Sequence, residues 1–211
     1  MADNQARYEE ITTISLDHFR EKHAVRERAI PLSREIVRTS ANAIRAIHRN
    51  EMEQAKTQVN AAGALVAETR ALLENHPDIY YTGYTQDGQK EFAEASCVYA
   101  FISGQEMPLP SDIGVETASY LNGMAEAASE LRRYILDSLR RDDDSRSEEL
   151  MQQMDDAYNV LLVMDFPDAL TGGLRRTTDQ LRAVLERTRG DLTMTMRQRR
   201  LERMLAAHGE D

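Results

Sequence analysis

Tryptophan is absent from the sequence, cysteine occurs once, and the 211 residues include only five prolines and ten glycines. With so few helix breakers, and with long stretches rich in Ala, Leu, Glu, Arg and Met, the composition favours helices and predicts little or no β structure. The single cysteine, Cys97, excludes a disulfide framework and a thiolate metal cluster, and it favours a reducing compartment. We interpret Cys97 as a small buried apolar residue.

Long apolar runs are also missing. No stretch approaches the roughly 18 apolar residues that a membrane span needs, and the first ten residues lack the apolar core of a signal peptide. We therefore expect a cytoplasmic protein with no membrane contact. The length fits one domain, so we predict a single all-helical domain over residues 1–211, in which the last few residues, including His208, are disordered.

Several common catalytic motifs are absent as well. The sequence has no Gly-x-x-x-x-Gly-Lys loop and no Gly-x-Ser-x-Gly elbow. No histidine stands three residues after the glutamates that are candidates for metal binding, as a ferritin-like di-iron site would require. A zinc site lacks its cysteine and histidine ligands.

Apolar periodicity predicts an all-α bundle of six or seven long antiparallel helices. Pro31 either kinks the helix that begins near Asp3 or opens the next helix. The segment from Asp78 to Gly88 is expected to be an ordered connector. A strongly basic stretch from Leu174 to about Leu205 is expected to form one helix, or two helices that are separated at Gly190-Asp191.

The charge distribution has more than one explanation. A formal net charge of -10 is unusual for a nucleic-acid binder, yet 23 of the 26 basic residues are arginine, which is suited to bidentate phosphate recognition. A GC-rich genome would give the same preference for arginine over lysine, and a saline cytosol would give a similar acid-rich, lysine-poor surface. One narrow face of the helix predicted from Leu32 to Asn50 carries Arg34, Arg38, Arg45 and Arg49. This face is compatible with a solvated surface or with a track for a sugar-phosphate backbone.

Two pairs of glutamates are the candidate chemical site. Glu91 and Glu94 lie one turn apart above an apolar face, and Glu126 and Glu130 lie four residues apart on another predicted helix. If these helices pack together, four carboxylates converge, and carboxylate oxygens are the ligands that Mg²⁺ and Mn²⁺ prefer. Such a metal would polarise a phosphate or activate a water, while a free carboxylate accepts a proton. Similar spacings occur on many helices, so the spacing alone is weak evidence.

Short motifs in this sequence resemble the translin superfamily, and they occur in the order typical of it. They cover the chain from about Ala24 to Gly190 and comprise Arg26-Glu27-Arg28, Ser33-Arg34-Glu35-Ile36-Val37, Ile47-His48-Arg49, Glu91-Phe92-Ala93-Glu94-Ala95, Tyr120-Leu121-Asn122-Gly123, Ser129-Glu130-Leu131 and a basic helix that ends near Arg189-Gly190. The acidic pairs resemble the translin-associated factor X (Trax) branch, and a single chain with both pairs resembles its archaeal type.

The resemblance implies a translin-like helical fold and a Mg²⁺-dependent endonuclease, with Mn²⁺ as an alternative metal. The implied substrate is single-stranded RNA, with single-stranded DNA as a further candidate, inside a homo-oligomeric barrel that is an octamer in the family. It implies metal-binding and catalytic roles for Glu91, Glu94, Glu126 and Glu130, where Glu126 replaces the usual aspartate. It also implies that Arg34, Arg38, Arg45 and Arg49 face the lumen and contact phosphates. The alternative is a non-catalytic translin-like protein that binds single-stranded RNA or DNA.

Overall fold

The computed structural model describes residues 4–208, which form nine helices and no strand. Three helices are single turns within connections: α3 (Pro77–Tyr80), α5 (Pro110–Ile113) and α8 (Asp168–Thr171). The six long helices are α1 (Gln5–His48), α2 (Met52–Leu72), α4 (Gly83–Ser103), α6 (Thr117–Leu139), α7 (Ser147–Leu162) and α9 (Leu174–His208). The predicted all-α bundle of six or seven long helices is confirmed.

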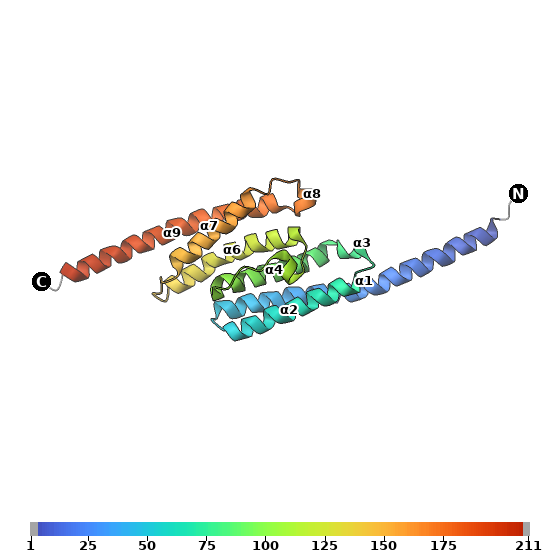
Figure 1. Cartoon of the computed structure of the whole chain (residues 1–211), viewed down its shortest axis with the longest axis horizontal. Coiled ribbons are helices and arrows are strands. Elements are labelled where there is room, and N and C mark those ends of the chain that lie inside the picture. The colour runs from blue at the N-terminus through green and yellow to red at the C-terminus, as the bar shows by residue number, and fades with distance from the viewer. Residues whose placement is uncertain (1–3, 209–211) are drawn as a thin grey trace.

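The long helices lie side by side along the long axis of the molecule (Figure 1). The α1–α2 hairpin packs against α4, α4 packs against α6, and α6 contacts both α7 and α9. A continuous apolar core follows these contacts, with Phe92, Val98, Leu131, Ile135 and Met154 among its buried members. Since α4 and α6 occupy the middle of the stack, the two acidic pairs lie on neighbouring central helices.

The two ends of the chain extend from the bundle in opposite directions (Figure 1). Residues 5–21 of α1 are exposed, and so is the last part of α9 before residue 207. Several large apolar side chains lie on these extensions, including Tyr8, Ile11, Phe19 and Leu205, whose exposed fractions are 62%, 57%, 66% and 63%.

The structure bears on two alternatives that the sequence left open, at Pro31 and at Gly190, and it corrects one expected helix boundary. Helix α1 neither ends nor restarts at Pro31, which is exposed, so the helix continues past the one hydrogen bond that proline cannot donate. Helix α9 also continues through Gly190, because Leu185 and Leu192 are buried on either side of it and hold both parts against the bundle. The predicted connector up to Gly88 is wrong in its second half, since α4 begins at Gly83.

The prediction that the last few residues are disordered falls on residues 209–211, which lie outside the described part of the chain, and on His208, which is the last residue of α9. Within residues 4–208, none of the helices combines the length and the apolar character that crossing a bilayer requires.

Candidate metal centre

Helices α4 and α6 cross at very short range, and Gly123 makes this approach feasible. A Cβ atom on Gly123 would lie 2.5 Å from the backbone oxygen of Lys90 and 2.8 Å from the backbone nitrogen of Glu94. Both neighbours are backbone atoms of α4 that cannot rotate away, so only glycine fits this contact. Gly123 therefore lets α6 lie against the turn of α4 that carries Glu91 and Glu94, one turn before Glu126.

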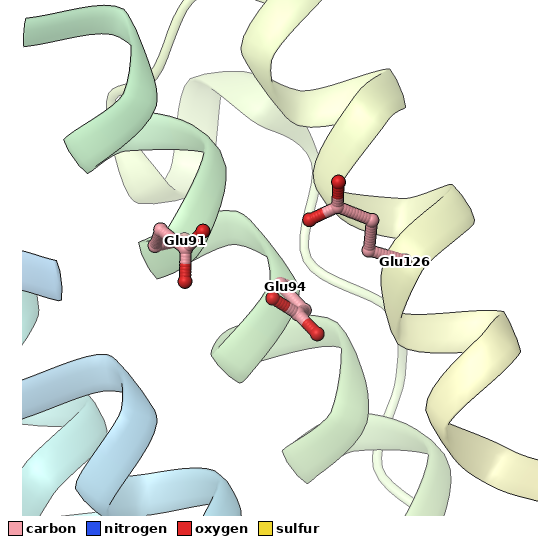
Figure 2. A group of neighbouring side chains, drawn as sticks. All are labelled: Glu91, Glu94 and Glu126. Carbon is pink, nitrogen blue, oxygen red and sulfur yellow. The ribbon is translucent and has the colours of Figure 1, made fainter. Parts of the chain in front are cut away.

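Three glutamates meet at this crossing (Figure 2). Glu91 and Glu94 extend from α4 and Glu126 extends from α6, and one carboxylate oxygen of each lies within 4.8 Å of the others. All three side chains belong to residues of intermediate burial. The two helices that carry the predicted acidic pairs are therefore in contact, and three of the four predicted carboxylates converge.

An ammonium group lies among these carboxylates. The Nζ atom of Lys90 is 2.7 Å from Oε2 of Glu126 and 3.2 Å from Oε1 of Glu91. Burial alone would lower the pKa of Lys90, but the hydrogen bond to Glu126 and its charge, together with Glu91, raise that pKa to about 12. Lys90 is therefore charged at neutral pH and balances part of the negative charge of the cluster.

Glu94 has the most perturbed carboxyl group at this site. Burial is the main cause, and with the charges of Glu91 and Glu126 it raises the pKa of Glu94 to about 8. Glu94 thus holds a proton at neutral pH in this arrangement, and binding of a cation would release it. Nearby on α4, burial raises the pKa of the Cys97 thiol to about 12. Cys97 is fully buried, which confirms its interpretation as an apolar core residue.

Glu130 lies beside this cluster but engages a different partner. Its Oε1 atom is 2.5 Å from Nε2 of His48 on α1 and 3.5 Å from Nη1 of Arg133. The hydrogen bond with His48 is the main cause that lowers the pKa of Glu130, and it outweighs the effect of burial. The His48 side chain is 5% exposed, and its Nδ1 atom has no partner among the described residues. The structure therefore ties Glu130 to α1, and its role as a metal ligand stays a prediction.

The predicted arginine face lies on the exposed side of α1. Arg38 forms an ion pair with Glu35 at 2.5 Å, and Arg49 forms one with Glu51 at 2.7 Å. The side chain of Arg34 has no hydrogen bond or ion pair to another described residue. Exposed local pairs contribute little free energy, so phosphate oxygens can replace these glutamates. Both interpretations therefore remain compatible with the arginine face, which consists of Arg34, Arg38, Arg45 and Arg49.

The cluster fits a hard divalent cation. Carboxylate oxygens suit Mg²⁺ and Mn²⁺, and the position of the Lys90 ammonium shows that positive charge is stabilised between the helices. Glu91, Glu94 and Glu126 would hold the ion, and Lys90 would leave Glu126 to make room for it. Such a site differs from a zinc site, because thiolates are missing from the described residues around it.

Sequence reasoning did not assign a role to Lys90, His48 or Gly123 in the chemistry. Lys90 is one of only three lysines and directly precedes Glu91, and this position next to a predicted metal ligand is the signal in the sequence that indicates it. The contact of His48 with Glu130 spans 82 residues of sequence, which local patterns do not reveal. The close approach at Gly123 depends on how two helices cross, and local sequence does not determine that.

Comparisons with known proteins agree with the helical fold. No family model matches the chain. An uncharacterized protein of Methanocaldococcus jannaschii is 30% identical over 179 residues, which are 84% of this chain and 79% of that protein. Crystal structures of AfC3PO, alone and in a complex with duplex RNA, are 32% identical and cover 92% of this chain and 98% of theirs, with TM-scores of 0.81 and 0.82. Apo-NeC3PO, which is 19% identical with the same coverage and a TM-score of 0.77, shares the fold.

The all-helical bundle matches the helical fold of the C3PO and translin proteins. The chain belongs to the translin superfamily, and within it the chain is Trax-like.

Proposed function

We propose that the protein is a Mg²⁺-dependent endonuclease that cleaves single-stranded RNA, with single-stranded DNA as a second substrate and Mn²⁺ as an alternative metal. The observation that carries this proposal is the convergence of Glu91, Glu94 and Glu126 across the contact between α4 and α6. Family membership supports it, and a solved structure of the similar AfC3PO is a complex with duplex RNA.

The chemistry divides between the ion and the side chains. A divalent cation bound here supplies polarisation of the scissile phosphate and lowers the pKa of an attacking water. Glu91, Glu94 and Glu126 would hold this ion, and a carboxylate of this cluster would accept a proton from the water. Glu130 remains ionised beside them because the hydrogen bond with His48 lowers its pKa. Hydrolysis forms a bond between the water oxygen and phosphorus and breaks the bond to the leaving sugar oxygen, which takes up a proton.

Helix α1 links the arginine face to this chemistry. Arg45 and Arg49 flank His48, and His48 contacts Glu130 beside the carboxylate cluster. A nucleic-acid strand whose phosphates bind along the arginine face therefore passes close to the carboxylate cluster. In the proposal, the face of Arg34, Arg38, Arg45 and Arg49 binds the sugar-phosphate backbone, since arginine pairs with phosphate in a bidentate way.

We also propose that the protein forms a homo-oligomer, with an octamer as the expected size. The extensions of α1 and α9 expose large apolar side chains, including Tyr8, Ile11, Phe19 and Leu205. Exposed apolar surface of this kind marks contact sites between proteins. Light scattering of the purified protein should give the mass of eight chains, and a monomer mass would contradict this part of the proposal.

The test of the proposed activity is a cleavage assay with end-labelled RNA. Single-stranded RNA should be cut internally in Mg²⁺ but not in EDTA, and a duplex of the same sequence should be cut more slowly. Glu126→Gln should abolish cleavage while leaving the far-ultraviolet circular dichroism and RNA binding intact. Glu68→Gln removes the same charge from an exposed position on α2, and it should cleave like the wild type.

The same assay can favour the non-catalytic alternative. RNA binding without cleavage in Mg²⁺ or Mn²⁺ would show a translin-like binding protein. Equal cleavage by wild type and Glu126→Gln would show that the nuclease site lies elsewhere.

A further inference from the structure

A cleft of about 900 Å³ opens beside the carboxylate cluster. Its walls come from the start of α4, the first half of α6, and the junction between α8 and α9. In Figure 1 the short helix α8 lies at the end of the bundle where α6 begins. Glu126, which belongs to the cluster, and Lys90, which contacts it, both line the cleft. The cleft therefore begins where the proposed metal site ends.

Hydrogen bonds fix the wall that α8 and α9 form. The buried side chain of Asn122 on α6 donates through Nδ2 to the backbone oxygen of Thr171, at 2.8 Å. Its Oδ1 atom accepts a hydrogen bond from the hydroxyl of Thr177, also at 2.8 Å. Between these two contacts, Gly172 and Gly173 have positive φ values of 62° and 84°, a conformation that suits glycine. The cleft is thus preformed and does not need to be assembled by a ligand.

The side chains that line the cleft include positively charged, acidic, amide, hydroxyl and apolar groups. Lys90 and Arg176 supply positive charge, and the side chain of Arg176 is exposed and has no hydrogen bond or ion pair to the rest of the described chain. Gln180 supplies an amide with both donor and acceptor capacity. Tyr81 and Leu170 supply exposed apolar surface, with exposed fractions of 63% and 70%.

This combination matches the parts of a nucleotide. Flat apolar surface and aromatic rings stack on bases, amides bind base edges, and arginine and lysine bind phosphate. The volume also lies within the range of roughly 300–1,000 Å³ that is usual for small-molecule sites. Three acidic residues also line the cleft. Glu116 accepts a hydrogen bond from the hydroxyl of Tyr80 at 3.0 Å, Glu126 pairs with Lys90 at 2.7 Å, and Asp87 is exposed.

We propose that this cleft is a nucleotide subsite, which holds the nucleotide next to the phosphate that lies at the carboxylate cluster. The inference rests on the proposed nuclease function, and it adds a recognition site that the arginine face of α1 does not provide. Arg176 binds the phosphate of this nucleotide, and Tyr81 with Leu170 contacts its base. The subsite fixes the position of the strand across the cluster.

The test uses the full chain in EDTA, so that binding is measured without cleavage and without a metal. Equilibrium dialysis with adenosine 5′-monophosphate should show saturable binding, and adenosine, which lacks the phosphate, should bind more weakly. Arg176→Gln should weaken binding of the monophosphate about tenfold, as expected for loss of a charge-assisted contact, and should leave adenosine binding unchanged. Arg182→Gln is the matched control, because Arg182 is exposed on the same helix outside the cleft.

A second readout separates this subsite from the metal centre. Arg176→Gln should raise KM for RNA cleavage and leave both kcat and the affinity for Mn²⁺ unchanged. If the wild type cleaves RNA but Arg176→Gln does not alter monophosphate binding, the nucleotide subsite is overturned and the nuclease function is not. Monophosphate binding that depends on Arg176, in a protein that cleaves no RNA, would support the nucleotide site and contradict the nuclease.

Discussion

Replacing Lys90 by glutamine should tighten metal binding, because the ammonium and the metal compete for the same oxygens. Lys90 contacts Glu126 at 2.7 Å and Glu91 at 3.2 Å, and both carboxylates belong to the group of three that converge. A cation gains these oxygens only when the ammonium leaves. Glutamine retains most of the side-chain length but carries no charge, so this competition disappears.

The size of the effect follows from these two contacts. The side chains of Lys90, Glu91 and Glu126 are 23%, 26% and 35% exposed, so solvent screens part of the attraction. Ion pairs that are screened in this way contribute up to about 1 kcal/mol each, and two such contacts give roughly 1–2 kcal/mol. Since about 1.4 kcal/mol corresponds to a tenfold change, Lys90→Gln should bind Mn²⁺ roughly 5- to 30-fold more tightly than the wild type.

Isothermal titration calorimetry with Mn²⁺ and metal-stripped protein measures this directly. Lys56→Gln is the control, since it removes the same charge from an exposed position on α2 and should bind Mn²⁺ like the wild type. Equal or weaker Mn²⁺ binding by Lys90→Gln would refute the competition between Lys90 and the metal.

Three further substitutions test other parts of the structure. Gly123→Ala places a Cβ 2.5 Å from a backbone oxygen of α4. It should therefore lower the free energy of unfolding in urea by about 1–3 kcal/mol and abolish Mn²⁺ binding. Gly83→Ala is the control, because its Cβ would meet open space, and it should change neither quantity. The pKa of Glu94 is about 8 in the fold, against 4.5 for an unperturbed glutamate. The folded state therefore holds an extra proton between these values, and the metal-free protein should lose stability as the pH rises from about 5 to 8. Glu94→Gln should remove this loss, and parallel melting-temperature profiles for both proteins would show that Glu94 is not its source. Arg45→Gln should weaken RNA binding and reduce its salt slope by about one phosphate contact, whereas an unchanged slope would indicate a solvated arginine face.

Much of the fold follows from residues that act locally. The apolar positions of α6 and α7 recur at helical spacing, and Leu131, Ile135 and Met154 are buried as that spacing requires. The burial of Cys97 follows from its small apolar character. The pairing of Glu91 with Glu94 needed only the geometry of one helix. Sequence could also suggest that Glu126 joins them, provided that α4 and α6 are neighbours.

Other features depend on contacts between distant residues, which local patterns do not contain. Pro31 and Gly190 are helix breakers by propensity, but tertiary burial of flanking residues keeps α1 and α9 continuous. Lys90 points from α4 to Glu126 on α6, and His48 reaches Glu130 across 82 residues. These two contacts decide how the charge of the cluster is balanced, and both depend on how the helices pack against one another.

The most direct test of the central claim is to locate the metal itself. Crystals grown with Mn²⁺ and measured near the manganese absorption edge would show the ion by its anomalous signal. The account predicts one peak bounded by the carboxylates of Glu91, Glu94 and Glu126, with the ammonium of Lys90 moved away from Glu126. A peak elsewhere, or no peak with Lys90 still bound to Glu126 at saturating Mn²⁺, would contradict a metal centre at the crossing of α4 and α6.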